Sequence, residues 1–189
     1  MQTNIETSPS RSIRKEFFAF RNGIVADKLR QAGDPHTIIM GCLLADITAI
    51  VERTRTSIGQ DDQLAHLANE LWADLNSREC RLAAPMLFPP EFMSQELALQ
   101  WCESVETVEI ADNLCHKLLR KTPIAEDLLQ SLTSHERPLT RYTGYRLMLN
   151  LLLMGKVKPS SQLRALIGSE ADEQLFGQLL KAIDEEWEN

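Results

Sequence analysis

One acidic side chain, Asp112, lies on the flank of the apolar stripe of a predicted helix that runs from Val108 to Leu118. A carboxylate held in place by a helix can stabilise positive charge in a reaction or orient an attacking water molecule. The same carboxylate can instead pair with His116, one helical turn later, or bond to a neighbouring helix. The sequence leaves these interpretations of Asp112 open.

Basic side chains gather directly after this helix. Residues 117–158 carry eight basic and three acidic side chains, whereas residues 61–116 carry two basic and eleven acidic ones. A basic segment between acidic ones can line a surface that faces phosphates, although a set of solvated helix faces would have the same composition. The net charge of −7 for the whole chain argues against a generic nucleic-acid binder.

Other kinds of reactive site find no support in the sequence. The four histidines are dispersed, and the adjacent Cys115 and His116 point about 100° apart on a helix, so they cannot readily share a metal ion. There is no glycine-rich phosphate loop, nucleophile elbow or dinucleotide-binding fingerprint. We therefore predict no metal and no cofactor.

Caps and breaks divide the chain into helices. Serine, threonine, proline and glycine punctuate apolar residues that recur with the period of a helix, and strand-like alternation is missing. The predicted helices span residues 9–33, 34–59, 61–74, 77–88, 94–101, 108–118, 122–132 and 138–155, with a last pair after Pro159.

From residue 61 these helices group into pairs of about 30 residues, the period typical of HEAT-like repeats. We therefore predict an all-α fold, a right-handed α-solenoid of four to five HEAT-like helix pairs, with a compact irregular bundle as the alternative. Trp72 and Trp101 are expected to pack between helices. The prediction is one domain over residues 1–189, with residues 1–10 flexible and residues 184–189 an acidic tail.

The cysteines and the apolar runs indicate where such a protein resides. The four cysteines show no close paired spacing, which is typical of buried free thiols in a reducing compartment. The longest apolar run, residues 147–154, is too short to span a bilayer, and no charged-then-apolar leader opens the sequence. The expectation is a cytoplasmic protein without membrane contact.

An ordered set of short segments also resembles a known family. The segments are Phe17-Phe18-Ala19-Phe20-Arg21-Asn22-Gly23, residues 30–33, Gly41, Leu71-Trp72, the Glu79-to-Met86 helix and Ala111-Asp112. Over residues 13–155 the chain resembles bacterial DNA alkylation repair proteins built from HEAT-like repeats. Members that act as glycosylases release positively charged alkylated purines from duplex DNA, which they cradle on a concave surface.

The resemblance implies roles for particular residues. Such glycosylases combine an aspartate, an aromatic residue one turn before it and an arginine on a later helix. Asp112 matches the aspartate, Val108 stands where the aromatic residue is expected, and the arginine position falls on Arg141 or, one residue later, on Tyr142. The expected contacts to DNA phosphates are Arg21, Lys117, Lys121, Arg141 and Arg146. For Arg21, bonding to the carbonyls of its own helix end is an equal alternative.

Two hypotheses about function follow. In the first, the protein binds alkylated duplex DNA and cleaves the N-glycosidic bond, with Asp112 as the stabilising acid. In the second, it is a non-catalytic HEAT-repeat scaffold that binds a protein or an atypical nucleic-acid structure. Val108, the net negative charge and the length of the chain favour the second.

Overall fold

The computed structural model describes residues 8–188, and this part of the chain is built of helices. It contains eleven α-helices and two short 3₁₀ helices, and its one β-type contact is an isolated bridge between Ile38 and Ser77. The predicted all-α class is therefore confirmed. By its internal contacts the chain divides into two compact units, one that ends at Pro89 and one that begins at Pro90.

The first unit consists of five helices. In it, α3 packs against α1 and α5, and α4 packs against α5. Side chains such as Phe17, Ile47 and Leu71 are fully buried between them. The helices are α1 (Pro9–Ala19), α2 (Gly23–Gln31), α3 (Leu44–Ile58), α4 (Asp61–Trp72) and α5 (Arg78–Leu87).

The break between α1 and α2 was not expected, because the sequence predicts one helix over residues 9–33. The side chain of Asn22 accepts a hydrogen bond from the N–H of Val25 at 3.2 Å and caps a new helix. The backbone N–H of Asn22 donates to the carbonyl of Met40 at 2.8 Å. The single-helix prediction is wrong here because a cap and a long-range backbone contact together end α1.

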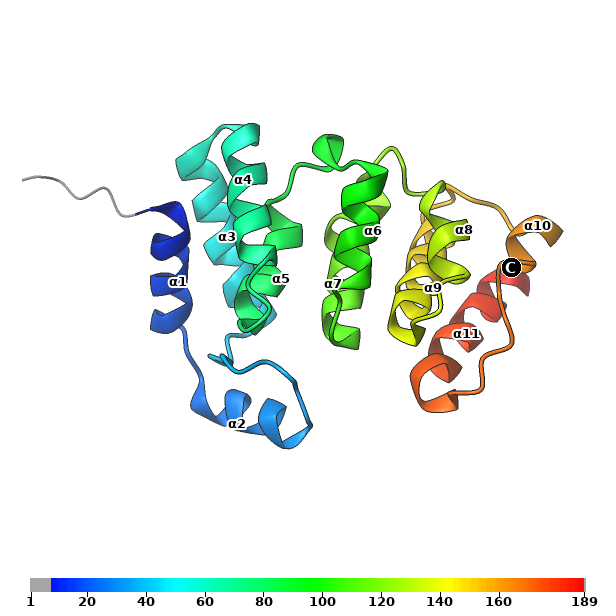
Figure 1. Cartoon of the computed structure of the whole chain (residues 1–189), viewed down its shortest axis with the longest axis horizontal. Coiled ribbons are helices and arrows are strands. Elements are labelled where there is room, and N and C mark those ends of the chain that lie inside the picture. Colours follow the sequence, from blue (N-terminus) through cyan, green and yellow to red (C-terminus); the bar gives the residue numbers. More distant parts are fainter. Residues whose placement is uncertain (1–7, 189) are drawn as a thin grey trace, which may run out of the picture. The chain divides into compact units, whose positions relative to one another are not determined.

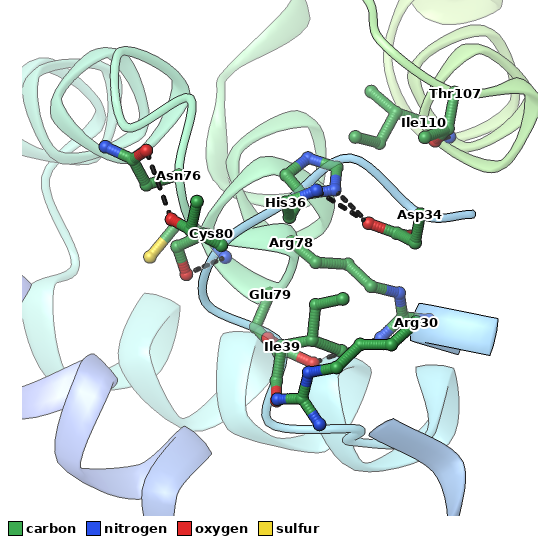
Figure 2. Close-up of polar contacts among 12 residues, drawn as sticks. Arg30, Asp34, His36, Ile39, Asn76, Arg78, Glu79, Cys80, Thr107 and Ile110 are labelled. Carbon is green, nitrogen blue, oxygen red and sulfur yellow. Dashed lines mark hydrogen bonds and ion pairs between the residues drawn. The ribbon is translucent and has the colours of Figure 1, made fainter. Parts of the chain in front are cut away.

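A second departure concerns residues 34–43, which the sequence assigns to a helix and which form an irregular loop instead. A buried carboxylate, Glu79 of α5, points into this loop beside Ile39 (Figure 2). Its oxygens accept hydrogen bonds from the N–H groups of Met40 (3.1 Å), Gly41 (3.0 Å) and Cys42 (3.3 Å). These bonds satisfy backbone donors that a helix would have satisfied internally.

Gly41 is required at the centre of this loop. Its φ is +75°, a left-handed conformation that residues with a Cβ rarely adopt. A Cβ at this position would lie 2.2 Å from the carbonyl oxygen of Asn22 and 2.6 Å from the nitrogen of Ala26. The glycine thus allows the loop to pass closely over the start of α2.

The second unit consists of six α-helices and the two 3₁₀ helices. Here α6 packs against α8, α7 packs against α9, and α9 packs against α11 (Figure 1). The elements are η1 (Pro90–Phe92), α6 (Gln95–Glu103), α7 (Val108–Lys117), η2 (Leu119–Lys121), α8 (Leu128–Thr133), α9 (Pro138–Leu153), α10 (Ser161–Arg164) and α11 (Glu173–Glu188).

The long helix α9 is the centre of this unit. Gly144 faces α8, where a Cβ would approach the Cβ of Leu132 to 2.8 Å. A glycine inside a helix usually lowers stability, but here it lets two helices pack closely. Since α9 is fixed between α7, α8 and α11, its side chains are held in defined positions against α7.

Several smaller sequence predictions can be compared with the structure. Trp72 and Trp101 are buried, and all four cysteines are buried free thiols, as predicted. Of the segment predicted to be flexible, residues 1–7 lie outside the described residues, while residues 8–10 form the cap and first turn of α1. The acidic residues from 184 onward continue α11 up to Glu188. The single domain over residues 1–189 stays a prediction.

Within residues 8–188, no helix combines the length and the apolar character needed to cross a membrane.

Candidate functional site

The candidate site is built around Asp112 on α7 of the second unit. The hydroxyl of Thr107 caps this helix by accepting from the N–H of Ile110 at 3.2 Å, which fixes where the helix begins. Ala111 and Asn113 on either side of Asp112 are buried. The side chain of Asp112 is 35% exposed, so it lies at the edge of the core and is accessible to solvent.

Two side chains of α9 hold one oxygen of Asp112. The hydroxyl of Tyr142 donates a hydrogen bond to Oδ1 at 3.0 Å, and Nε of Arg146 lies 3.2 Å from the same oxygen. The Nε–H of Arg146 is not aligned for a hydrogen bond, so the arginine contact is an ion pair. The other oxygen, Oδ2, has no hydrogen-bond partner among residues 8–188. The carboxylate is thus anchored on one side and available on the other.

Burial and charge act in opposite directions on this carboxylate. Partial burial raises the pKa of Asp112 above its ordinary value, while the charge of Arg146 and the bond from Tyr142 lower it. Burial is the largest effect, so the net pKa is raised. The pKa of Tyr142 is raised as well, first by burial and then by the charge of Asp112, and its hydroxyl therefore remains a donor.

Removing this hydroxyl by Tyr142→Phe is expected to raise the pKa of Asp112 further, because the hydrogen bond favours the ionised form. The free energy of unfolding should fall by about 1 kcal/mol or less, since water can reach the partly exposed carboxylate. The pKa can be measured from the carboxyl ¹³C shift of Asp112 as a function of pH. Tyr145→Phe is the matched control, because that hydroxyl bonds to Glu170. An unchanged Asp112 titration in Tyr142→Phe would contradict the assignment.

The structure shows which partner Asp112 has, His116 or a neighbouring helix. Asp112 bonds to a neighbouring helix, whereas His116 contacts Arg120 instead. Of the two later candidates, Tyr142 faces Asp112. The arginine beside Asp112 is Arg146, one turn further along α9, which the sequence assigned only to phosphate contact. Tyr142 and Arg146 are four residues apart, which puts both on one face of a helix. This spacing is the signal in the sequence that could have indicated the pair.

Arg141, by contrast, is engaged elsewhere. Its guanidinium makes two bonds to the carboxylate of Glu170, Nε at 2.7 Å and Nη2 at 2.8 Å, and Nη1 donates to the carbonyls of His135 (3.0 Å) and Glu136 (2.8 Å). The hydrogen bond to Glu170 is the largest cause of the raised pKa of Arg141. Arg141 therefore ties the segment before α11 to α9.

An aromatic cluster supports Tyr142 from the side of α11. The ring of Phe176 lies 6.4 Å from the ring of Tyr142 and 5.8 Å from that of Tyr145. Tyr145 also donates to Glu170 at 2.9 Å and accepts from the N–H of Gly168 at 3.1 Å. These contacts restrict the rotamer of Tyr142. The sequence did not single out Phe176 or Glu170, because both lie more than 20 residues from their partners.

The position one turn before Asp112 carries no aromatic ring. Val108 is the first residue of α7, and 39% of its surface is exposed. Tyr142 is an aromatic residue that contacts Asp112, but the contact is made by its hydroxyl group and not by the face of its ring. The residue is only 6% exposed. The structure thus places a small apolar side chain where the family resemblance implies an aromatic residue.

The remaining predicted phosphate contacts lie in different places. Lys117 ends α7 and Lys121 ends η2, both within the second unit. Arg21 lies in the first unit, where its Nη1 donates to the carbonyl of Phe18 at 3.0 Å and its guanidinium stacks over the Phe18 ring at 4.2 Å. Of the two alternatives for Arg21, the structure contains the bond to the carbonyl of its own helix end.

The described part of the chain has no cluster of metal-ligating side chains. Among residues 8–188, no three His, Cys, Asp or Glu side chains gather in a way that could hold a metal ion. The groups that meet at Asp112 are a carboxylate, a phenol and a guanidinium.

Comparison with known proteins places the chain in a family. The family model described as DNA alkylation repair enzyme matches residues 13–175, which is most of the chain. Searches of curated proteins and of solved structures return no significant match. The matched range contains the whole of α7 and α9, and hence Asp112 and both residues that hold it. The chain belongs to the DNA alkylation repair enzyme family.

Proposed function

We propose that this protein binds duplex DNA that contains alkylated purines and cleaves the N-glycosidic bond, with Asp112 as the stabilising carboxylate. The observation that carries the proposal is the geometry of Asp112. One oxygen is anchored by Tyr142 and Arg146, and the other has no protein partner among the described residues. Membership of the DNA alkylation repair enzyme family supports a role in DNA repair.

The chemistry fits a carboxylate held in this way. A cationic alkylated purine is already a good leaving group, so its departure builds positive charge on the sugar. The free Oδ2 of Asp112 would stabilise that charge and orient the attacking water. The charge of Arg146 favours the ionised form of the partly buried carboxylate, and the hydrogen bond from Tyr142 fixes its direction. Neither residue has to exchange a proton with the substrate.

In this proposal the DNA lies along the concave face of a right-handed HEAT-like solenoid. The stacking of α7 on α9 and of α9 on α11 supports that arrangement within the second unit. Lys117 and Lys121 would contact phosphates there, and Arg146 would do so while its Nε stays paired with Asp112. Arg21 and Arg141 belong to the same proposal, and each would first have to leave the contact it now makes, with Phe18 and Glu170 respectively. We place the protein in the cytoplasm, where its buried cysteines would stay reduced.

A second candidate is a non-catalytic reader or scaffold that binds DNA or a protein without cleaving a bond. Val108 favours it, because a valine offers no aromatic face to a cationic base or to the sugar. The net charge of −7 favours it as well.

One experiment separates the two candidates. The protein is incubated with methylated duplex DNA, free 7-methylguanine and 3-methyladenine are quantified by chromatography, and DNA binding is measured in parallel at several salt concentrations. The proposal predicts release of free base together with binding that weakens as salt increases. Binding without release would establish the reader. If the protein shows no base release and no salt-sensitive binding, DNA is excluded as the ligand, and the protein-binding scaffold is left.

A further inference from the structure

A cluster of basic side chains lies at the end of α7 and in η2, next to the turn that carries Asp112. We refer to four residues, His116, Lys117, Arg120 and Lys121, as the basic cluster. Nζ of Lys156 donates to the carbonyl of Arg120 at 2.7 Å, which fixes the backbone of η2 beneath it. His116 and Lys121 are exposed, so the cluster is accessible from solvent.

The contact inside this cluster requires a neutral histidine. Nη2 of Arg120 lies 3.3 Å from Nε2 of His116. A guanidinium can only donate hydrogen bonds, so this nitrogen of the imidazole must be the acceptor and cannot carry a proton. If His116 becomes protonated, this bond is lost and two cations face each other.

Two members of the cluster, Lys117 and Arg120, have no acidic partner among the described residues. Within residues 8–188, Nε of Arg120 is also buried without a hydrogen-bond partner. Elsewhere in the same unit, Arg141 pairs with Glu170 and Arg164 pairs with Asp184. The nearest acid along the helix, Asp112, is already paired with Arg146. Arg120 thus has a neutral ring where Arg141, Arg146 and Arg164 have a carboxylate.

The surrounding charges act on His116 from every side. Its pKa is lowered, first by burial and then by the charges of Arg120, Lys117, Lys121 and Arg146. A histidine in the last turn of a helix would ordinarily have its pKa raised by the helix dipole. The neighbouring cations outweigh that effect, so the cluster has a local excess of positive charge that an anion would relieve.

We propose that His116 and Arg120, together with Lys117, form a binding site for one phosphate of the DNA backbone, and that His116 takes up a proton from solvent when the phosphate binds. The choice of DNA as the source of the phosphate rests on the proposed function. On binding, Arg120 turns from the imidazole to the phosphate, and the protonated Nε2 of His116 donates to a second phosphate oxygen. The negative charge that enters compensates for the added proton.

This coupling has a measurable sign. Because the bound state holds one more proton than the free state, affinity for DNA rises as the pH falls through the titration range of His116. If the phosphate raises the pKa of His116 by about one unit, binding becomes about tenfold tighter below that range. A variant with a fixed positive charge at position 116 should bind equally well on both sides of the range.

The test is fluorescence anisotropy with a labelled DNA duplex at constant ionic strength, at about pH 5.5 and about pH 7.5, on either side of the ordinary histidine pKa. We expect wild type to bind more tightly at the lower pH, by up to about tenfold. His116→Gln, whose amide oxygen can still accept from Arg120, should lose most of that difference, and His116→Lys should bind tightly at both pH values. His66→Gln is the matched control, because His66 is an exposed histidine on α4 of the first unit, and it should behave as wild type.

The outcomes separate this inference from the function on which it rests. If wild type binds DNA and His116→Gln retains the full pH dependence, the phosphate site at His116 is overturned while DNA binding stands. If wild type fails to bind the duplex at both pH values in low salt, the proposed function itself fails, and the assignment of the cluster to a DNA phosphate fails with it. As an independent readout, addition of the duplex should move the ¹H titration of the His116 ring to higher pH.

Discussion

Replacing Glu79 with alanine should destabilise the protein by about 3–5 kcal/mol, the largest effect on stability that we expect from a single substitution. The substitution removes the acceptor of three consecutive backbone N–H groups, those of residues 40–42, in a part of the first unit where Glu79 itself is fully buried. Arg78 would also lose the carboxylate that lies 3.1 Å from its Nη1. Each buried polar group left without a partner adds to the cost.

Urea denaturation followed by circular dichroism measures this effect. Glu79→Gln should be intermediate, because the amide oxygen can still accept while the amide nitrogen cannot. Glu70→Ala is the matched control, since Glu70 is an exposed glutamate on α4, and it should change the free energy of unfolding by about 0.5 kcal/mol or less. An unfolding free energy for Glu79→Ala close to that of Glu70→Ala would show that the loop does not depend on this carboxylate.

Asp112→Asn is expected to lower the rate of base release by about 10²-fold or more, the scale typical of losing a preorganised electrostatic contact in a transition state. The neutral amide can no longer stabilise positive charge on the sugar. The matched control is Asp127→Asn, which neutralises an exposed aspartate at the start of α8 in the same unit and should release base at the wild-type rate. Initial rates on methylated duplex DNA compare the three proteins.

The same substitution should leave the fold intact. The pKa of Asp112 is raised in the folded protein, so between the unfolded and folded values the folded state binds more protons, and this carboxyl costs stability as the pH rises through that range. Removing the charge relieves that cost, while Arg146 loses an ion pair that is about a third exposed and therefore weak. The free energy of unfolding should change by about 1 kcal/mol or less. If Asp112→Asn instead lost much stability, its slower base release could not be attributed to the missing charge. Such a loss would also contradict the weak ion pair described here.

Local signals predicted much of the fold because they act within one helical turn. Ser8, Ser77 and Ser94, which the sequence marks as helix starts, each accept a hydrogen bond from a backbone N–H of the helix that follows. Residues 34–43 could not be predicted in the same way. Their conformation depends on Glu79, which lies 37 to 39 positions from the N–H groups it accepts. No local pattern records that contact.

In the candidate site, too, the local feature could be predicted from the sequence and the long-range contacts could not. Asp112 stands out in the sequence as an acid on the flank of an apolar helix stripe, and in the structure its side chain is 35% exposed at the edge of the core. Which arginine faces it depends on how α7 packs against α9. That packing places Arg146 beside Asp112, while Glu170, which lies 29 positions after Arg141, holds Arg141 away from the site.

The most direct test of the central claim is a single-turnover experiment with a duplex that contains one 7-methylguanine, with the protein in excess and free base followed over time. We expect wild-type protein to release the base in a single exponential phase, and we expect Asp112→Asn to bind the same duplex but to release the base about 10²-fold or more slowly. A duplex that stays intact when it is saturated with wild-type protein would contradict a catalytic role for Asp112.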